Sequence, residues 1–261
     1  MNSNDSQPQL YELNPLGRFS DRASDYVKYR PSYPAAAIDA ILDGLGEPSQ
    51  LTAADIGAGT GISSRLLAQR GVRVLAIEPN AEMRQAAAPD ALVEFRGGTS
   101  EATNLPDTSI DLVTCFQSFH WFNPVLTLPE FRRILKPGGR LAVVWNLRDD
   151  RSDPVTLGYT QITKTGSQND PAEKADQSID ALLASSHFTD VRQCDFANRQ
   201  DVDIAGLIGR AKSASYIPQS GPAWEKIISD LTQLYETHCD DRGLVSLVYK
   251  TRVYLAVVAN N

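Results

Sequence analysis

The sequence is poor in the residues that build disulfide frameworks and metal centres. It has three cysteines and three histidines among 261 residues. Cys115, Cys194 and Cys239 are far apart and odd in number, which excludes a disulfide framework and argues against a zinc site. We therefore expect reduced cysteines, a cytoplasmic protein and no bound metal.

Long apolar runs and positive charge are also scarce. No apolar stretch reaches the roughly 18 residues that a membrane-spanning helix requires. The first ten residues are polar and lack the charged-then-apolar layout of a secretory signal. The formal net charge is −7, so a basic face for nucleic acid is not expected. We expect neither a membrane nor a nucleic-acid partner, and a chain that acts as a monomer or homodimer.

A short apolar strand is followed by a turn with glycine at every second position and then by a helix-like run. The turn contains Asp55, Gly57, Ala58, Gly59 and Gly61. Glycines at a strand-to-helix turn let the backbone approach a ligand closely. A second apolar run, 72–77, ends in Glu78, and an acid about 20 residues after such a turn is placed to accept from both hydroxyls of a ribose. Together these features predict a nucleoside pocket at the carboxyl ends of parallel strands.

The glycine spacing separates two classes of nucleoside site. A dinucleotide site requires Gly-x-Gly-x-x-Gly, whereas the third glycine here is Gly61, followed directly by Ile62. The pattern Asp-x-Gly-x-Gly-x-Gly that starts at Asp55 instead resembles the first motif of class I S-adenosylmethionine-dependent methyltransferases. This resemblance implies that the loop carries the methionine end of S-adenosyl-L-methionine and that Glu78 holds its ribose.

Further residues of the expected cofactor pocket follow the later strands. Met83 lies in a helix expected over 81–88, and its thioether suits one face of an adenine. In the resembling family the loop after the third strand meets the adenine, often through an acid–Ala pair before Leu-Pro. Glu101 and Ala102 precede Leu105-Pro106 in this way. The resemblance thus implies these further cofactor contacts: Pro79, Met83, Thr99, Ser100, Glu101, Ala102, Gln117 and Trp121.

Three other segments restrict the resemblance to one subgroup of this family. Residues 29–34 (Tyr-Arg-Pro-Ser-Tyr-Pro), 120–122 (His-Trp-Phe) and 135–139 (Leu-Lys-Pro-Gly-Gly) resemble segments of small-molecule methyltransferases akin to trans-aconitate methyltransferase, in the same order. The resemblance covers roughly residues 17–147 and is specific for the cofactor but weak for the substrate. It implies an N-terminal flap in which Arg30, a fixed cation, lies near the methionine carboxylate. Alternatively, this segment packs on the outside of the sheet.

One α/β fold accounts for the whole pattern, and its composition, 42% hydrophobic and 22% charged, is typical of soluble globular proteins. The resemblance implies a Rossmann-like, seven-stranded, mostly parallel sheet in the order 3-2-1-4-5-7-6, with an antiparallel last strand, helices on both faces and a helical cap. We expect a disordered tail (1–16), a cofactor-binding core (17–147), an insertion or cap (148–185) and C-terminal strands with cap helices that complete the same domain (186–261). Among the C-terminal elements we expect a sixth strand over 188–196, helices over 201–215 and 224–235, and a last strand over 244–258.

The expected chemistry is transfer of a methyl group to a small organic molecule. Transfer from a sulfonium is a direct displacement, so the protein mainly supplies proximity, alignment and a dry pocket. A carboxylate acceptor needs no base, and cations such as Arg148, Arg210 or Lys212 would hold it. A phenol, hydroxyl or amine acceptor would lose its proton to His120, the catalytic candidate. The alternative for His120 is a structural contact at the strand end.

Other classes of protein are weighed against this one. A short-chain nicotinamide-dependent oxidoreductase normally carries Tyr-x-x-x-Lys, and no tyrosine here has lysine four positions on. A nucleic-acid amino-methyltransferase is expected to carry Asn/Asp-Pro-Pro-aromatic after the fourth strand, where residues 117–120 read Gln-Ser-Phe-His. A cofactor-binding regulatory protein that has lost catalysis stays open, although an intact set of pocket residues argues against that loss.

Overall fold

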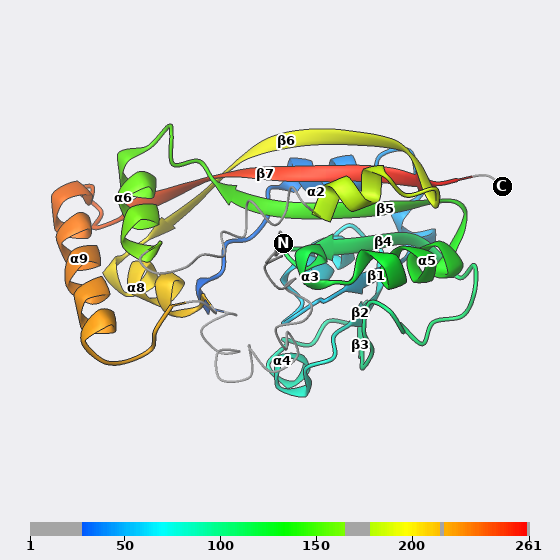
Figure 1. The fold of residues 1–261 in the computed structure, drawn as a ribbon, viewed down its shortest axis with the longest axis horizontal. Helices are drawn as coiled ribbons and strands as arrows, with labels where there is room; N and C mark the ends of the chain where they lie inside the picture. Colours follow the sequence, from blue (N-terminus) through cyan, green and yellow to red (C-terminus); the bar gives the residue numbers. More distant parts are fainter. Residues whose placement is uncertain (1–27, 165–177, 215–216, 260–261) are drawn as a thin grey trace, which may run out of the picture.

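The computed structural model describes residues 28–164, 178–214 and 217–259. Its centre is a seven-stranded sheet with the strand order β3-β2-β1-β4-β5-β7-β6 (Figure 1). β7 pairs antiparallel with β5 and β6, and the other neighbours are parallel. The strand order and the antiparallel last strand expected from the sequence are confirmed. The strands are β1 (Thr52–Ile56), β2 (Arg73–Ile77), β3 (Val93–Arg96), β4 (Ile110–Phe116), β5 (Leu135–Arg148), β6 (Phe188–Val202) and β7 (Val245–Val258).

Helices cover both faces of the sheet. One face packs on α5 and on the helical segment 178–183, with Leu128 and Leu182 in the shared core. The other face packs on α2 and α3 through residues such as Ile38 and Leu67. In the described ranges, no helix is both long and apolar enough to cross a membrane. The helices are α2 (Ala35–Leu42), α3 (Ile62–Ala68), α4 (Ala81–Gln85), α5 (Pro124–Ile134), α6 (Pro154–Thr163), α8 (Ile204–Lys212) and α9 (Pro222–His238), with 3-10 turns η3 (Pro48–Gln50) and η4 (Phe119–Trp121).

Several helices begin at side-chain caps that the sequence supplies. Asn80 Oδ1 accepts from the backbone N–H of Met83 at the start of α4, and Asn123 and Asp203 cap α5 and α8 in the same manner. α4 ends at residue 85, before the expected end at 88.

β6 is longer than the sequence predicts. It runs to Val202 rather than to residue 196, and residues 197–202 pair with residues 245–250 of β7. β6 is an edge strand whose side chains are mostly half-buried or exposed, and polar residues dominate its second half. Such a segment has no apolar signal, and its backbone hydrogen bonds to β7 hold it in the sheet. Exposed charges along it, such as Arg192 and Asp195, suit a sheet edge.

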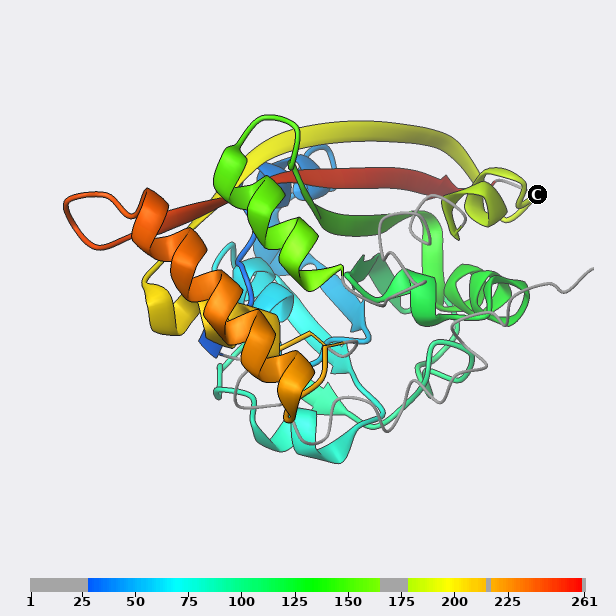
Figure 2. The same ribbon diagram turned by 60° about the vertical axis from the view of Figure 1, so that its left-hand side comes forward.

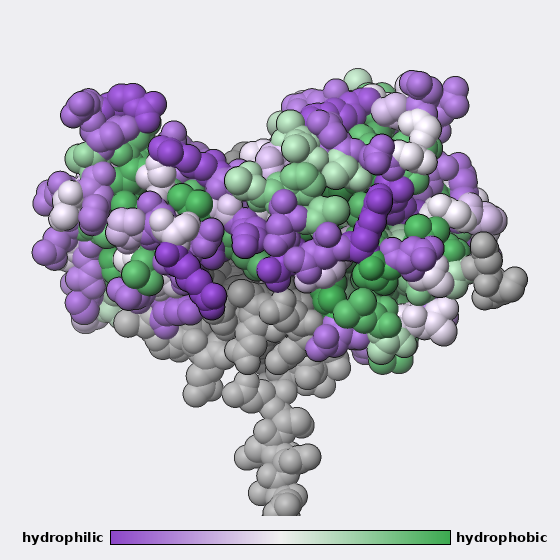
Figure 3. Space-filling view, turned by 90° about the horizontal axis from the view of Figure 1, so that it is seen from above, coloured by the Kyte–Doolittle hydropathy of each residue, from purple (hydrophilic) through white to green (hydrophobic). Residues whose placement is uncertain are grey.

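The C-terminal end of β6 and the N-terminal end of β7 form a second lobe with α6, α8 and α9, here named the cap lobe (Figures 1 and 2). It has its own buried cluster, which includes Tyr159, Leu207, Leu231 and Tyr249. Seen from above, the surface is hollowed between the cap lobe and the rest of the molecule (Figure 3). The expected tail (1–16) and part of the expected insertion lie outside the described residues, so the division into segments stays a prediction.

Residues 29–33, here named the linking segment, contact the main sheet. The backbone oxygen of Ser32 accepts from Nδ2 of Asn146 in β5 at 3.1 Å and from Nδ2 of Asn198 in β6 at 2.9 Å. The Tyr33 ring packs edge-on against Phe116 at the end of β4, with 4.7 Å between ring centroids. These contacts fix the linking segment across the ends of β4 and β5 and against Asn198 within β6.

The linking segment also contacts the cap lobe. The Tyr29 ring lies so close to α8 that a Cβ added at Gly209 would stand 2.4 Å from it. Arg30 Nη2 donates to the backbone oxygen of Ser213 at 3.0 Å, just after α8. The segment therefore joins the cap lobe to the sheet, and its sequence signal is the glycine at position 209 that admits the tyrosine ring.

Gly209→Ala is expected to destabilise the protein by about 1–3 kcal/mol, because the new methyl group overlaps the Tyr29 ring. Without the ring the same change should be neutral or stabilising by up to about 1 kcal/mol, since alanine is the better helix former. Urea unfolding of Gly209→Ala in the wild-type and Tyr29→Ala backgrounds measures the difference. Equal effects in the two backgrounds would show that the ring does not pack on α8.

Candidate functional site

The functional residues expected from the sequence gather where the parallel strands end. β1 lies between β2 and β4, with Ile56 level with Ile77 and Asp55 level with Thr114. The loops that follow these strands therefore start side by side at one edge of the sheet. In an open parallel sheet this edge is where ligands bind.

The glycine turn after β1 has a backbone that other residues adopt poorly. Gly57, Gly59 and Gly61 have φ angles of 68°, 58° and 74°, which lie in the left-handed region. A Cβ on Gly57 would stand 2.7 Å from Ser118 Cβ, and one on Gly61 would stand 2.6 Å from the Phe95 ring. The turn therefore needs glycine for its conformation and for its close neighbours.

Asp55 organises this turn from inside the fold. Its side chain is fully buried, and its oxygens accept from the hydroxyls of Ser63 and Ser64 in α3 at 2.6 Å each and of Thr114 in β4 at 2.8 Å. Burial raises the pKa of Asp55, and the three hydroxyl donors oppose that rise. The carboxylate thus ties β1 to α3 and β4, so its effect on a ligand would pass through the position of the turn.

Glu78 faces the same turn from the end of β2. One carboxylate oxygen accepts from the N–H of Gly59 and the other from the N–H of Asn80, both at 2.9 Å. Burial raises the pKa of Glu78; the two N–H donors and Arg84 oppose this shift, and the charge of Asp55 adds to it. Each carboxylate oxygen keeps a further lone pair with which to accept from a ligand.

Pro79 and Met83 follow Glu78 directly. The Pro79 carbonyl accepts from Arg84 Nη1 at 2.9 Å. Met83 is 4% exposed in the short helix α4. The structure therefore brings both residues to the segment that follows β2 and Glu78.

The loop after β3 is folded on itself and held against α5. Thr99 Oγ1 accepts from the N–H of Ala102 at 3.2 Å, and Ser100 Oγ accepts from Thr127 in α5 at 3.1 Å. Glu101 Oε1 lies 3.4 Å from the N–H of Asn123, at the start of α5. The four residues expected here, 99–102, are therefore neighbours in one compact loop beside β2.

Glu130 in α5 anchors the same loop, and no sequence signal pointed to it. It accepts from the N–H and the hydroxyl of Thr103, at 2.9 and 2.6 Å, and pairs with Arg133. The hydrogen bond from Arg133, then those from Thr103, lower the pKa of Glu130 to about 2. Glutamate at a helix position facing a Thr-containing loop is too common a pattern to be informative.

Because the pKa of Glu130 falls from 4.5 to about 2 on folding, its contribution to stability is present above pH 4.5 and is lost as the pH drops towards 2. Glu130→Gln is expected to flatten the acid limb of the stability curve in this window and to lower stability at pH 7. Urea unfolding between pH 2 and 7 measures both effects. Parallel curves for the variant and wild type would contradict the assignment.

The end of β4 carries the remaining candidates. Gln117 has φ 54°, a costly conformation for a residue with a side chain, and its Nε2 donates to the backbone oxygen of Asn146 at 3.0 Å. His120 is 8% exposed, and its Nδ1 accepts from the indole N–H of Trp145 at 3.1 Å. The ring centroids of Trp121 and His120 are 5.3 Å apart. Strained backbone and buried aromatic groups thus meet at this strand end.

The cations expected near the acceptor lie in or beside the cap lobe. Arg148 ends β5 and stands 5.4 Å above the Tyr159 ring in α6. Arg210 is buried in α8, and its Nη1 lies 3.4 Å from Ser213 Oγ, while Arg30 donates to the backbone of the same serine. Arg30 therefore contacts the cap lobe, and its assignment to the methionine carboxylate stays a prediction. Lys212 is the last residue of α8.

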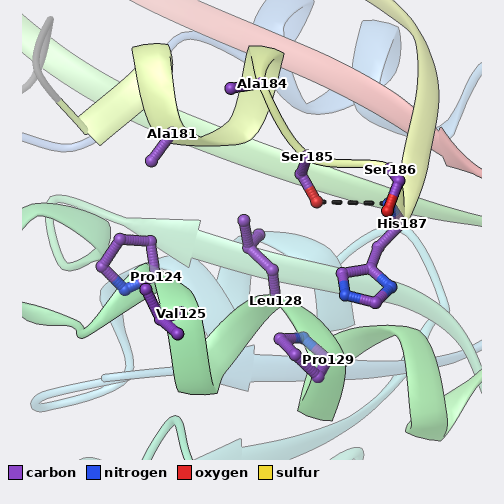
Figure 4. A pocket seen from close by; sticks show the side chains of 9 residues that line it. All are labelled: Pro124, Val125, Leu128, Pro129, Ala181, Ala184, Ser185, Ser186 and His187. Carbon is purple, nitrogen blue, oxygen red and sulfur yellow. Dashed lines mark hydrogen bonds between the residues drawn. The ribbon is translucent and has the colours of Figure 1, made fainter.

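A groove of about 320 Å³ elsewhere on the molecule is not this site. Figure 4 shows it between α5 and residues 181–187, on the α5 face of the sheet. Its lining has no Asp, Glu, Lys or Arg: Pro124, Val125, Leu128, Pro129, Ala181, Ala184, Ser185, Ser186 and His187. It lacks the carboxylate and glycine turn that a nucleoside requires. Among the described residues no group of three or more His, Cys, Asp or Glu is placed to hold a metal.

The glycine turn and its surroundings fit an amino-acid-bearing nucleoside. The turn offers close backbone approach, and the Glu78 carboxylate keeps acceptor lone pairs beside it. Thr60, between two of the glycines, is buried, and its hydroxyl has no hydrogen-bond partner within the described ranges. A hydroxyl inside a glycine-rich turn is a donor suited to a ligand carboxylate. Sequence reasoning passed over Thr60, although its position between two glycines was visible.

Comparison with known proteins decides the class. Residues 54–143 match the family model described as a methyltransferase domain. An uncharacterised methyltransferase of Mycobacterium tuberculosis is 33% identical over 250 residues, which cover 92% of this chain and 96% of that protein. The chain belongs to the S-adenosylmethionine-dependent methyltransferases. The cofactor of this methyltransferase is S-adenosyl-L-methionine, as the resemblance of the glycine turn implies, and its expected class of enzyme is confirmed.

Two further proteins are similar to this methyltransferase. The 2-methyl-6-phytyl-1,4-hydroquinone methyltransferase of Synechocystis is 33% identical over 220 residues, 80% of this chain and 63% of that protein. A solved structure from Anaeromyxobacter dehalogenans, provisionally described as a type II methyltransferase, has a TM-score of 0.62 at 21% identity and covers 88% of this chain and 97% of its own. The latter likeness concerns the fold alone.

Proposed function

We propose that this methyltransferase transfers a methyl group to a small organic molecule bound between the sheet edge and the cap lobe. The observation that carries the proposal is the linking segment, which fixes the cap lobe beside the ends of β4 and β5 through Tyr29 and Ser32. An acceptor enclosed between two lobes is limited in size. The net charge of −7 supports the same proposal, because it does not favour nucleic acid. The Synechocystis relative, named for a hydroquinone acceptor, adds support.

We propose that the cofactor is held around the glycine turn by residues of the strand ends and of the linking segment. The close backbone of the turn and the Thr60 hydroxyl receive its amino-acid end, Glu78 accepts from its ribose hydroxyls, and Met83 with the loop 99–102 covers its adenine. When bound, S-adenosylmethionine supplies an electrophilic methyl group on a sulfonium. The chain's own residues then orient the acceptor and exclude water. The proposed contact set is Arg30, Gly57, Ala58, Gly59, Thr60, Gly61, Glu78, Pro79, Met83, Thr99, Ser100, Glu101, Ala102, Gln117 and Trp121, with Asp55 acting through the turn.

The partners and location of the protein complete the proposal. All three cysteines are free in the structure, which supports a reducing compartment, and we propose the cytoplasm. We propose a small-molecule acceptor as the partner of the enzyme, which acts as a monomer or a homodimer. Size measurement in solution by light scattering distinguishes those two states.

Labelled methyl transfer tests the proposal. The protein is incubated with S-adenosylmethionine that carries a deuterated methyl group and with a panel of carboxylates, phenols and amines. Mass spectrometry then identifies any labelled product and the atom that carries the label. Label in one acceptor class is the expected result. Binding of the cofactor without transfer to any member of the panel would favour the alternative of a regulatory protein that has lost catalysis.

A further inference from the structure

The side chain of Trp145 donates a hydrogen bond to the ring of His120. The indole is 1% exposed in β5, and its Nε1–H can only donate. A buried N–H without an acceptor is costly, so buried tryptophans pair this group. Here the acceptor is Nδ1 of His120, at 3.1 Å. The lone pair of one ring nitrogen of His120 is therefore already in use.

This hydrogen bond fixes which nitrogen of the neutral His120 ring carries the hydrogen. A neutral imidazole has one N–H and one acceptor nitrogen, so acceptance at Nδ1 puts the hydrogen on Nε2. The other tautomer, and the imidazolium, would set an N–H of His120 against the N–H of Trp145. The 3-10 turn η4 fixes the backbone at His120, because Trp121 N donates to Ser118 O at 2.9 Å and Phe122 N donates to Phe119 O at 3.1 Å.

We propose that Trp145 holds His120 in the Nε2–H tautomer, so that His120 is a positioning residue which donates a hydrogen bond to the methyl acceptor. His120 follows β4 at the sheet edge where the ligand binds, and Nε2 lies on the side of its ring away from Trp145. The role towards the acceptor rests on the proposed function, whereas the tautomer does not. The acceptor would then present an oxygen lone pair to Nε2–H, and His120 would not take its proton.

Nitrogen NMR on the ligand-free protein tests the tautomer. Long-range proton–nitrogen correlation of ¹⁵N-histidine protein at pH 7.5 distinguishes the two tautomers and the imidazolium, and the His120→Gln spectrum identifies the signals of His120. The expected result is a single Nε2–H tautomer in the wild type, a mixture in Trp145→Phe, and no change in the control Trp224→Phe, which alters a partly buried tryptophan of α9 in the cap lobe. An Nδ1–H tautomer, an imidazolium, or an unchanged spectrum in Trp145→Phe would overturn the proposal.

Three variants of His120 distinguish the contribution of Nδ1 from that of Nε2. Asparagine places an amide oxygen near the position of Nδ1, glutamine places an amide N–H near the position of Nε2, and leucine supplies neither. We expect His120→Asn to keep the wild-type unfolding midpoint, while His120→Leu and His120→Gln lose a few degrees because the Trp145 N–H has no acceptor. This readout requires no ligand.

Kinetics with the acceptor that the labelling experiment identifies test the role of His120. If His120 donates, His120→Gln retains the rate, and His120→Leu and His120→Asn raise KM by about 2–10-fold, the effect of one hydrogen bond. If His120 is a base, all three variants lose about 10²–10⁴-fold in kcat together with the acid limb of the pH profile, which would overturn the proposal. Failure to find any labelled acceptor would count against the proposed function, while the NMR and unfolding results would still decide the tautomer.

Discussion

Gly57→Ala is expected to abolish measurable cofactor binding and to destabilise the protein by about 2–5 kcal/mol. The left-handed conformation of Gly57 costs about 1–2 kcal/mol for a residue with a Cβ. The new methyl group would also stand 2.7 Å from Ser118 Cβ, and such overpacking costs about 1–3 kcal/mol. Ser118 cannot move aside without loss, because its hydroxyl donates to the Ile56 carbonyl at 2.7 Å. The turn must shift, and with it the backbone that approaches the cofactor.

Gly138→Ala is the matched control for this prediction. Gly138 has φ 73°, close to that of Gly57, but nothing lies within 4 Å of a Cβ built on it. The control therefore bears the conformational cost of about 1–2 kcal/mol alone and should bind S-adenosylhomocysteine like the wild type. Urea unfolding and calorimetric titration measure both variants. Equal losses of stability and affinity in the two variants would show that the close approach at Gly57 does not matter.

Glu78→Gln is expected to weaken binding of S-adenosylhomocysteine about 10–100-fold at pH 7.5, because hydrogen bonds to a charged acceptor are worth about 1.5–3 kcal/mol each and those to a neutral one less. Binding favours the ionised carboxylate, and burial raises the pKa of Glu78 above 4.5. The affinity of the wild type should therefore begin to fall at a pH above 4.5 on acidification. The variant should lack this fall, since it has no carboxyl group to protonate.

Glu94→Gln serves as the control for Glu78. Glu94 lies on β3, the strand beside β2, with its side chain 49% exposed and paired with Arg73 and Arg96. This substitution removes the same charge from the next strand without touching the turn, so affinity and its pH dependence should match the wild type. A similar loss of affinity in both variants would indicate a general effect of charge, and Glu78 would lose its assignment to the ribose.

The sheet order was predictable because its signals are local and strong. The glycine turn, the buried runs of β1 and β4 and the acid after β2 each follow from a few adjacent residues, and the resemblance to one family supplied the strand order. The second half of β6 was missed because polar residues of an edge strand have no periodicity that marks them. Its place in the sheet follows from pairing with residues 245–250, a contact between distant segments.

The sequence predicted that most of the candidate residues lie at the ends of the parallel strands, but it did not predict their hydrogen-bond partners. Sequence spacing placed Asp55 in the pocket, but the three hydroxyls that occupy its oxygens come from α3 and β4, and only the fold brings them together. Likewise the contact of Arg30 with Ser213 and that of His120 with Trp145 join residues far apart in the chain. A side chain's partners decide whether it binds, positions or donates, and no local pattern contains them.

The most direct test is calorimetric titration of the wild-type protein with S-adenosylmethionine, S-adenosylhomocysteine and NADH in parallel. The account predicts micromolar binding of both sulfur nucleosides and none of NADH, because the turn at Gly57 to Gly61 lacks the later glycine of a dinucleotide site. Binding of NADH alone would contradict it, and the glycine turn and Glu78 would then have to be assigned to a dinucleotide.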